Sequence, residues 1–191
     1  MRMIRCLIVA TALLLGSFAS AKNSGVGLSV GMGLPFLQQV GLNYKISDRF
    51  GLSFGYNLLD LSSGAASVKL SMPELLVHYH PFSGAFFVAA GLGQEALEVT
   101  AKDLTTGATA KADVKSMAAI AKTGWMWGLA NNGFWFGVDL AFVSPSNPDV
   151  NITAPGVPTN STAYTDTVDA AKKFGETSFT NITFARIGWV F

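Results

Sequence analysis

The chain has 191 residues, half of them hydrophobic, and a formal net charge of +1. This near-neutral charge gives no support to a nucleic-acid partner. Only 13% of the residues are charged, about half the usual share in a soluble globular domain, so the composition argues against an ordinary soluble protein.

The N-terminus has the parts of a secretory signal peptide. Arg2 and Arg5 give a positive start, residues 7–15 form a short apolar run, and small residues lead up to Ala21. We therefore predict a cleavable signal peptide at 1–21, cut after its last residue. A transmembrane anchor is the alternative, but the apolar run is far shorter than the ~20 residues of a spanning helix.

The mature chain predicted at 22–191 contains no cysteine, because Cys6 leaves with the signal peptide. Disulfides, thiol chemistry and cysteine-based metal sites are therefore excluded. Loss of Arg2 and Arg5 leaves eleven basic and twelve acidic residues, a net charge of −1. The apolar residues never form a block long enough for a spanning helix, which is typical of a membrane β-barrel.

The mature sequence alternates large apolar residues with small or polar ones, the period expected of β-strands. The alternation predicts an all-β fold, an eight-stranded antiparallel up-and-down transmembrane β-barrel. The fourth strand changes parity near Pro73, and a bulge or a local break is predicted there, since proline cannot donate a ladder hydrogen bond. The predicted strands cover 25–33, 40–47, 50–58, about 68–80, a segment starting at 85, a segment ending at 129, 134–142 and 185–191.

The large apolar set is predicted to face lipid. A soluble barrel of the lipocalin kind would point these residues inward and carry charge outside. Here the other set consists mainly of glycine, serine and asparagine, which cannot solvate an exterior but leave room for a few long side chains in a lumen. Large apolar side chains on the outside carry no penalty in hydrocarbon.

The connections alternate between short and long, as in outer-membrane barrels. The links at 47–49, 81–84 and 130–133 are tight, so both termini and the short turns are predicted to face the periplasm. The link at 144–178, rich in Pro, Asn, Thr and Ser, is predicted as a long extracellular loop. The fifth and sixth strands exceed the ~9–11 residues that a bilayer requires. They are predicted to form a hairpin above the membrane, tipped at 104–107 and polar on both faces.

The ending Ile187-Gly188-Trp189-Val190-Phe191, behind a signal peptide and an eight-strand meander, resembles the small barrel families typified by the OmpA membrane domain, OmpX and OmpW. The resemblance implies a location in the bacterial outer membrane, surrounded by lipid and lipopolysaccharide. It also implies that Ile187, Trp189 and Phe191 form the signal that such proteins present to the barrel-assembly machinery. The likeness to OmpW implies, as an alternative function, a narrow channel for small or hydrophobic solutes.

The inward parity collects a small set of ionisable residues. Apart from the histidine, it holds three positive and three negative groups, and matched signs favour an internal salt-bridge network because unpaired buried charge is costly. The network predicts a side-chain plug in the lumen; a gated polar path is the alternative. The predicted lumen residues are Lys45, Glu74, His78, Glu95, Lys122, Asp139 and Arg186.

Catalysis and metal binding are not supported by the sequence. His78 and His80 share a strand face, but no third ligand is evident, and no serine is placed for a catalytic triad. We expect no catalytic residues, metal or cofactor. The leading prediction is a non-enzymatic barrel with a structural role in the envelope or a surface-interaction role through its loops. For 144–178 the default interpretation is a mobile, solvated loop, and binding of an extracellular ligand is the alternative. A lipid-modifying enzyme is the third choice.

Overall fold

The computed structural model describes residues 25–63, 66–102, 109–129, 133–154 and 162–191. The predicted signal peptide at 1–21 and the hairpin tip at 104–107 lie outside these ranges. No helix in the described part of the chain is both long and apolar enough to cross a bilayer.

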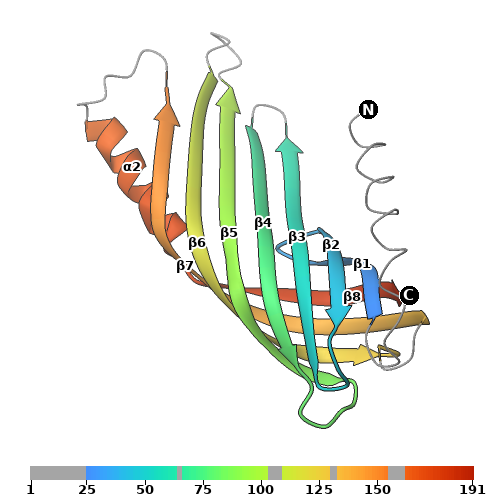
Figure 1. Cartoon of the computed structure of the whole chain (residues 1–191). Coiled ribbons are helices and arrows are strands. Elements are labelled where there is room, and N and C mark those ends of the chain that lie inside the picture. Colours follow the sequence, from blue (N-terminus) through green and yellow to red (C-terminus); the bar gives the residue numbers. More distant parts are fainter. Residues whose placement is uncertain (1–24, 64–65, 103–108, 130–132, 155–161) are drawn as a thin grey trace.

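Eight antiparallel strands form a closed barrel, as predicted, because the last strand pairs with both the seventh and the first. The first strand begins and the last strand ends at the same end of the barrel as the turns predicted at 47–49, 81–84 and 130–133 (Figure 1). We call this the short-turn end. The predicted alternation of short and long connections is wrong in part, because 35–37 and 64–65 at the other end also join their strands within three residues. The strands are β1 Gly25–Leu34, β2 Gln38–Lys45, β3 Phe50–Ser63, β4 Ala66–Tyr79, β5 Phe86–Lys102, β6 Thr109–Trp127, β7 Gly133–Thr153 and β8 Phe179–Val190.

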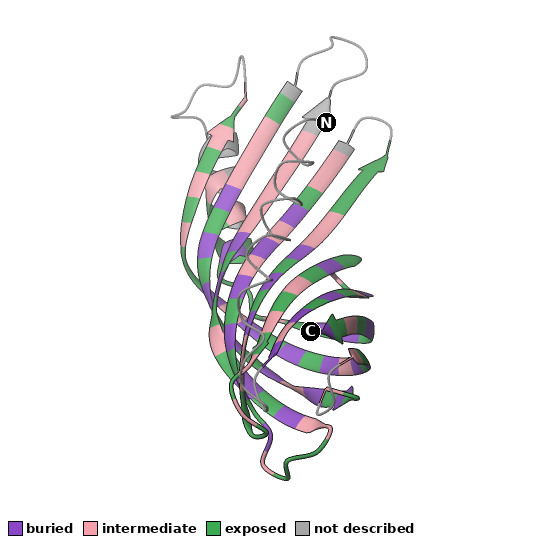
Figure 2. Cartoon of the chain, turned by 45° about the vertical axis from the view of Figure 1, so that its right-hand side comes forward, coloured by how far each residue is buried: buried purple, intermediate pink, exposed green. Residues whose placement is uncertain are grey.

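The predicted faces are correct along most of the barrel. Buried and exposed residues alternate in bands along the strands (Figure 2). The exposed set contains the large apolar side chains of the outward parity, such as Phe54, Leu92 and Phe142. The buried set contains the small and polar residues of the lumen, such as Ser29, Ser53 and Thr183. The wall therefore has the apolar exterior of a membrane barrel.

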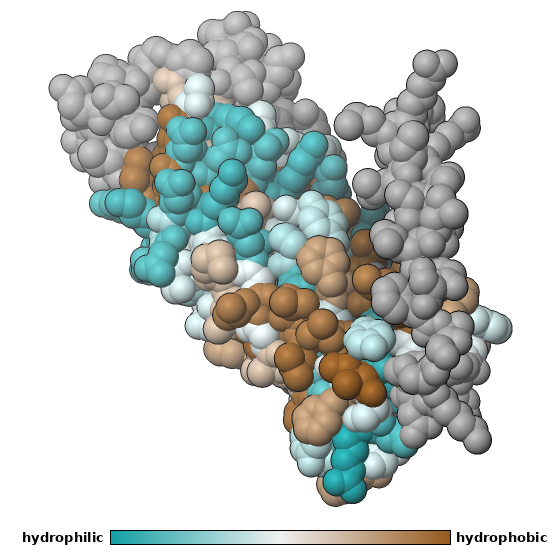
Figure 3. Space-filling view, in the orientation of Figure 1, coloured by the Kyte–Doolittle hydropathy of each residue, from teal (hydrophilic) through white to brown (hydrophobic). Residues whose placement is uncertain are grey.

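The polarity of the wall inverts away from the short turns, where β3–β7 rise above the shorter β1, β2 and β8 (Figure 1). The prediction of a hairpin polar on both faces is wrong here, because the two faces of β6 differ. The outward set is charged, as the upper part of the space-filling view shows (Figure 3), whereas the inward set is apolar. The outward residues are Asp60, Lys69, Glu98, Lys111, Asp113 and Lys115, and the inward ones are Leu59, Leu70, Leu97 and Val114.

The long loop predicted at 144–178 is wrong in its boundaries. Residues 144–153 continue β7, and a helix, α2 (Thr162–Gly175), occupies much of the remainder. Two of the prolines that indicated a loop, Pro145 and Pro148, lie on β7 beyond the pair Val143–Phe179, where its pairing with β8 stops. Proline is tolerated at such an edge strand because no neighbour requires its missing N–H. The helix contacts β7 and β6 and so covers part of this edge.

The change of parity predicted at Pro73 is also wrong. Pro73 stays in register opposite Tyr56 of β3, with its neighbour Met72 completely buried. Towards β5, pairing is interrupted between Ser71–Ala96 and Glu74–Gly93, and resumes in the same register. The missing N–H therefore interrupts one ladder without inserting a residue, so the predicted local break is confirmed and a bulge is not formed.

Candidate functional site: the charged lumen

Glycines create the room for charged side chains in the lumen. Glu74 lies over Gly55, where a Cβ atom would come within 2.8 Å of the Glu74 Oε1 atom. Gly124 instead allows its register partner Asp139 on β7 to approach closely, because a Cβ atom at position 124 would overlap the Val138 carbonyl oxygen and come within 2.8 Å of the Asp139 Cβ atom. The glycines of the inward parity therefore set where long polar side chains fit, which is how a narrow eight-stranded barrel is filled.

Four of the predicted lumen residues form a continuous ion-pair network. The Lys122 ammonium donates to Glu74 Oε1 at 2.7 Å and lies 3.9 Å from Asp139 Oδ1. Arg186 Nη2 lies 3.1 Å from Asp139 Oδ2. The Lys122 side chain is fully buried and the two carboxylates are nearly so. The network links β4, β6, β7 and β8 across the barrel and balances two positive with two negative charges.

Neutral side chains complete this network, and the sequence prediction missed them. The Thr183 hydroxyl lies 2.9 Å from Asp139 Oδ1 and 3.1 Å from Gln39 Oε1. Arg186 Nη2 donates to the same Gln39 oxygen at 3.2 Å. Inward parity was the available signal for Gln39 and Thr183, but it could not separate them from other small or polar residues of the wall.

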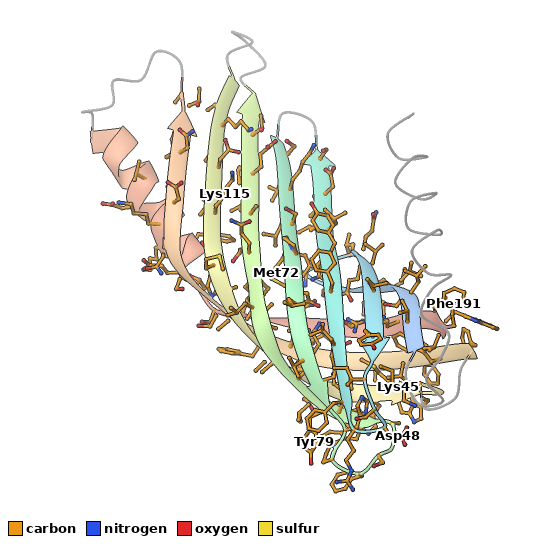
Figure 4. All side chains as sticks on the ribbon, viewed as in Figure 1. Lys45, Asp48, Met72, Tyr79, Lys115 and Phe191 are labelled. Carbon is orange, nitrogen blue, oxygen red and sulfur yellow. The ribbon has the colours of Figure 1, made fainter. Side chains whose placement is uncertain are left out.

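The remaining predicted lumen residues stand apart from the network. Lys45 forms an ion pair at 3.0 Å with Asp48 of the adjoining turn, and the two are labelled together at the short-turn end (Figure 4). Glu95 lies towards the opposite end, buried on β5 opposite Ser116 of β6. Its Oε2 atom has no hydrogen-bond partner among the described residues. The six charged lumen residues predicted from the sequence are therefore not one network. Four form the central network, Lys45 pairs at a turn, and the Glu95 carboxylate stands alone within the residues that the structure describes.

His78 contacts a serine that sequence reasoning did not single out. Its Nε2 atom lies 2.7 Å from Ser53 Oγ, while Nδ1 has no hydrogen-bond partner in the part of the chain that the structure describes. A catalytic triad requires a carboxylate at that second nitrogen. The Phe87 ring lies near both histidines, 5.0 Å from the His78 ring and 5.9 Å from the His80 ring. Among the described residues no group of three or more metal-ligating side chains occurs.

Two small cavities lie along the lumen wall formed by β1–β4. One, of about 40 Å³, opens at the short-turn end and is lined by Lys45, His78 and His80 among others. The other, of about 10 Å³, lies deeper, beside Ser53, Glu74 and Arg186. A water molecule requires at least ~10–15 Å³ on this scale. The deeper cavity therefore holds one water at most.

His80 lies in the turn after β4, outside the spanning strands. Burial lowers its pKa below the ordinary 6.5, and the charge of Lys45 acts in the same direction; backbone hydrogen bonds to Gly84 and Phe86 oppose the shift. The folded protein therefore binds the proton less well than the unfolded chain. The resulting stabilisation is complete above pH 6.5 and is lost as the pH falls towards the lower pKa of the folded state.

We expect His80→Gln to remove this pH dependence. The wild type should lose more stability than the variant between about pH 7.5 and about pH 5.5. Urea midpoints of the two proteins, refolded in the same lipid, measure this difference. Equal losses of stability in the wild type and the variant over this pH range would contradict the assignment of the pH dependence to His80.

Aromatic side chains cluster at the short-turn end, an arrangement typical of the interfacial girdle of a membrane barrel. The Phe86 ring contacts both Phe82 and Trp125, and Trp127 stacks on Phe136 at 4.6 Å. The predicted assembly-signal residues Ile187, Trp189 and Phe191 are all exposed on the outward face at the end of β8. Exposed apolar side chains with an aromatic border are suited to lipid and not to water.

The closed barrel, its exposed apolar belt and its aromatic border define the class: the chain is a small outer-membrane β-barrel. Its fold is similar to that of a major outer membrane protein from Thermus thermophilus, with a TM-score of 0.60 and 12% identity over 88% of this chain and 98% of that one. It is also similar to CarO2 of Acinetobacter baumannii, with a TM-score of 0.50 and 13% identity over 90% and 100% of the two chains. No family model and no curated protein matches the sequence.

Proposed function

We propose that this protein is a non-enzymatic, structural component of the bacterial outer membrane, with a lumen plugged by side chains. The observation that carries the proposal is the buried network of Lys122, Glu74, Asp139 and Arg186. Its charges balance, and the cavity beside it holds one water at most. A hydrated ion needs a continuous wide path, so these side chains act as a plug.

Planar-bilayer recordings test this proposal. The purified protein, shown to be folded by the heat-dependent shift of its gel mobility, is expected to produce no steady conductance. Lys122→Met is the informative variant because it removes the central cation of the network. Reproducible wild-type channels that this substitution changes would instead support a gated channel for small solutes.

A narrow channel remains the second candidate because the two cavities follow one wall of the barrel. Asn43 lines both, and the Ser53–His78 pair lies between them. A rearrangement of these side chains would connect the short-turn end with the central network. The channel hypothesis therefore requires conductance that responds to substitution of His78 or Ser53.

We also propose that Ile187, Trp189 and Phe191 form the signal recognised by the barrel-assembly machinery. Their exposure on alternate positions at the end of β8 supports this role. Phe191→Ala is expected to reduce the amount of protein in the outer membrane while the refolded protein keeps its urea midpoint. Phe134→Ala, which removes an exposed aromatic from β7 at the same end, is the matched control. Equal losses for both variants would contradict a specific signal.

The part of β3–β7 above the apolar belt, together with α2, is the surface that we propose for interactions outside the cell. Its outer face carries the charged pairs Lys111–Glu98 at 3.0 Å and Lys111–Asp113 at 3.2 Å. Rigid scaffolds commonly present binding residues in this way. The role is tested by comparing binding to host or envelope surfaces with and without residues 155–174, provided that the shortened protein still shows the heat-dependent mobility shift.

A further inference from the structure

Glu95 is a buried carboxylate that the lumen network does not use. Glu74 and Asp139 have ion-pair partners, whereas no ion pair or hydrogen bond involves Glu95 within the described part of the chain. The residue is only 4% exposed. It lies between the pairs Ser71–Ala96 and Glu74–Gly93 of the β4–β5 ladder. A buried carboxylate without a partner is costly, and a cationic ligand would remove that cost.

The end of α2 adds to the negative potential at this place. Ser116, the cross-strand neighbour of Glu95 on β6, donates a hydrogen bond from Oγ to the Gly175 carbonyl at 2.8 Å. Gly175 is the last residue of α2 and packs closely against Val114 and Pro148. The C-terminal end of a helix carries partial negative charge. Glu95 and this helix end therefore both favour a cation.

The inner wall leads from the extracellular side down to Glu95. Leu61 near the rim is 51% exposed, Val68 and Val99 are half-buried, and Leu70 and Val114 further down are buried. Because β1, β2 and β8 are short, no strand in the described part of the chain rises opposite this wall (Figure 1), and the end of α2 lies against its inward-facing Val114 and Ser116. An apolar surface that becomes more enclosed towards a carboxylate is suited to a molecule with an apolar body and one positive charge.

We propose that Glu95 binds an organic cation, with an ammonium group paired to its carboxylate and an apolar body against the inner wall of β3–β6. A metal ion fits less well, because the described residues hold no group of three metal-ligating side chains. The basic side chains of α2, Lys172 and Lys173, are exposed, where solvent and salt screen their repulsion. This site is separate from the plugged network and does not depend on whether the lumen conducts.

Calorimetric titration with benzylammonium tests the proposal on the full-length mature protein, refolded in an uncharged maltoside detergent. Benzyl alcohol, which has the same apolar body without the charge, is the control probe. The wild type is expected to bind benzylammonium about 10-fold or more tightly than benzyl alcohol, as a charge-assisted hydrogen bond predicts. Equal affinities, or no benzylammonium binding at millimolar concentration, would overturn the proposal.

Two variants assign the binding to Glu95. Glu95→Gln, of nearly the same volume, is expected to abolish the preference for the charged probe. Glu98→Gln removes a carboxylate three residues further along β5, on the outer face, and is expected to leave the preference unchanged. If Glu95→Gln retains the preference, the proposal is wrong. If that variant loses the heat-dependent mobility shift, Glu95→Asp replaces it: the charge is retained at shorter reach, so weaker but still charge-selective binding is expected, and unchanged affinity for benzylammonium would contradict the proposed contact.

Discussion

Asp139→Ala is expected to lower the free energy of unfolding by about 3–5 kcal/mol. Asp139 pairs with Arg186 at 3.1 Å and lies 3.9 Å from the Lys122 ammonium, and its side chain is only 2% exposed. Its removal leaves two buried cations with one carboxylate, Glu74, between them. The urea midpoint of the variant refolded in lipid vesicles measures the loss.

Two further variants separate burial from simple loss of charge. Asp113→Ala removes a carboxylate from the partly exposed pair with Lys111, and such pairs contribute about 0–1 kcal/mol. Replacing Asp139 by Ala and Arg186 by Met together removes both members of the buried pair and should cost less than Asp139→Ala alone. An Asp139→Ala midpoint equal to that of Asp113→Ala would mean that the charge is solvated.

Alternation predicts the strands and their faces because every second residue of a strand meets the same environment. For that reason the lumen position of Asp139 and Arg186 could be predicted, and so could their proximity, since both lie a few residues from the short-turn end on neighbouring strands. The limits of β7 could not be predicted in the same way. The prolines of β7 indicate a loop when the sequence is read locally. They are tolerated because the β7–β8 ladder stops at Val143–Phe179, which leaves the rest of β7 as an edge strand.

Which lumen residues pair with one another depends on how far along the barrel axis each side chain lies. Counting the positive and negative residues of the sequence does not give that position. Glu95 belongs to the inward parity like Glu74, but it lies above the network and opposite Ser116. The Ser53–His78 contact arises between neighbouring strands, where Gly51 is the register partner of His78. Strand tilt and side-chain length decide such contacts, and neither follows from residue type.

Trp135→Ala is the second substitution expected to have a large effect, a loss of about 3–5 kcal/mol in the free energy of unfolding. Trp135 is completely buried and is one of the largest side chains of the lumen. Its indole nitrogen has no hydrogen-bond partner within the described ranges, so the expected loss is one of packing. Gly188 is its register partner on β8.

The indole occupies the space that a side chain at position 188 would need, because a Cβ atom there would overlap the ring carbons and nitrogen. Gly188→Val in the wild type should therefore destabilise the barrel by about 1–3 kcal/mol or more. In the Trp135→Ala background the ring is absent, and the close contact that remains is the Leu28 carbonyl oxygen, 2.6 Å from the same Cβ position. The same change should therefore cost less than in the wild type. The two single variants and the double variant, refolded in the same lipid, measure this difference. If the losses of the two single variants simply add in the double variant, Gly188 is required by the backbone of β8 and not by the Trp135 ring.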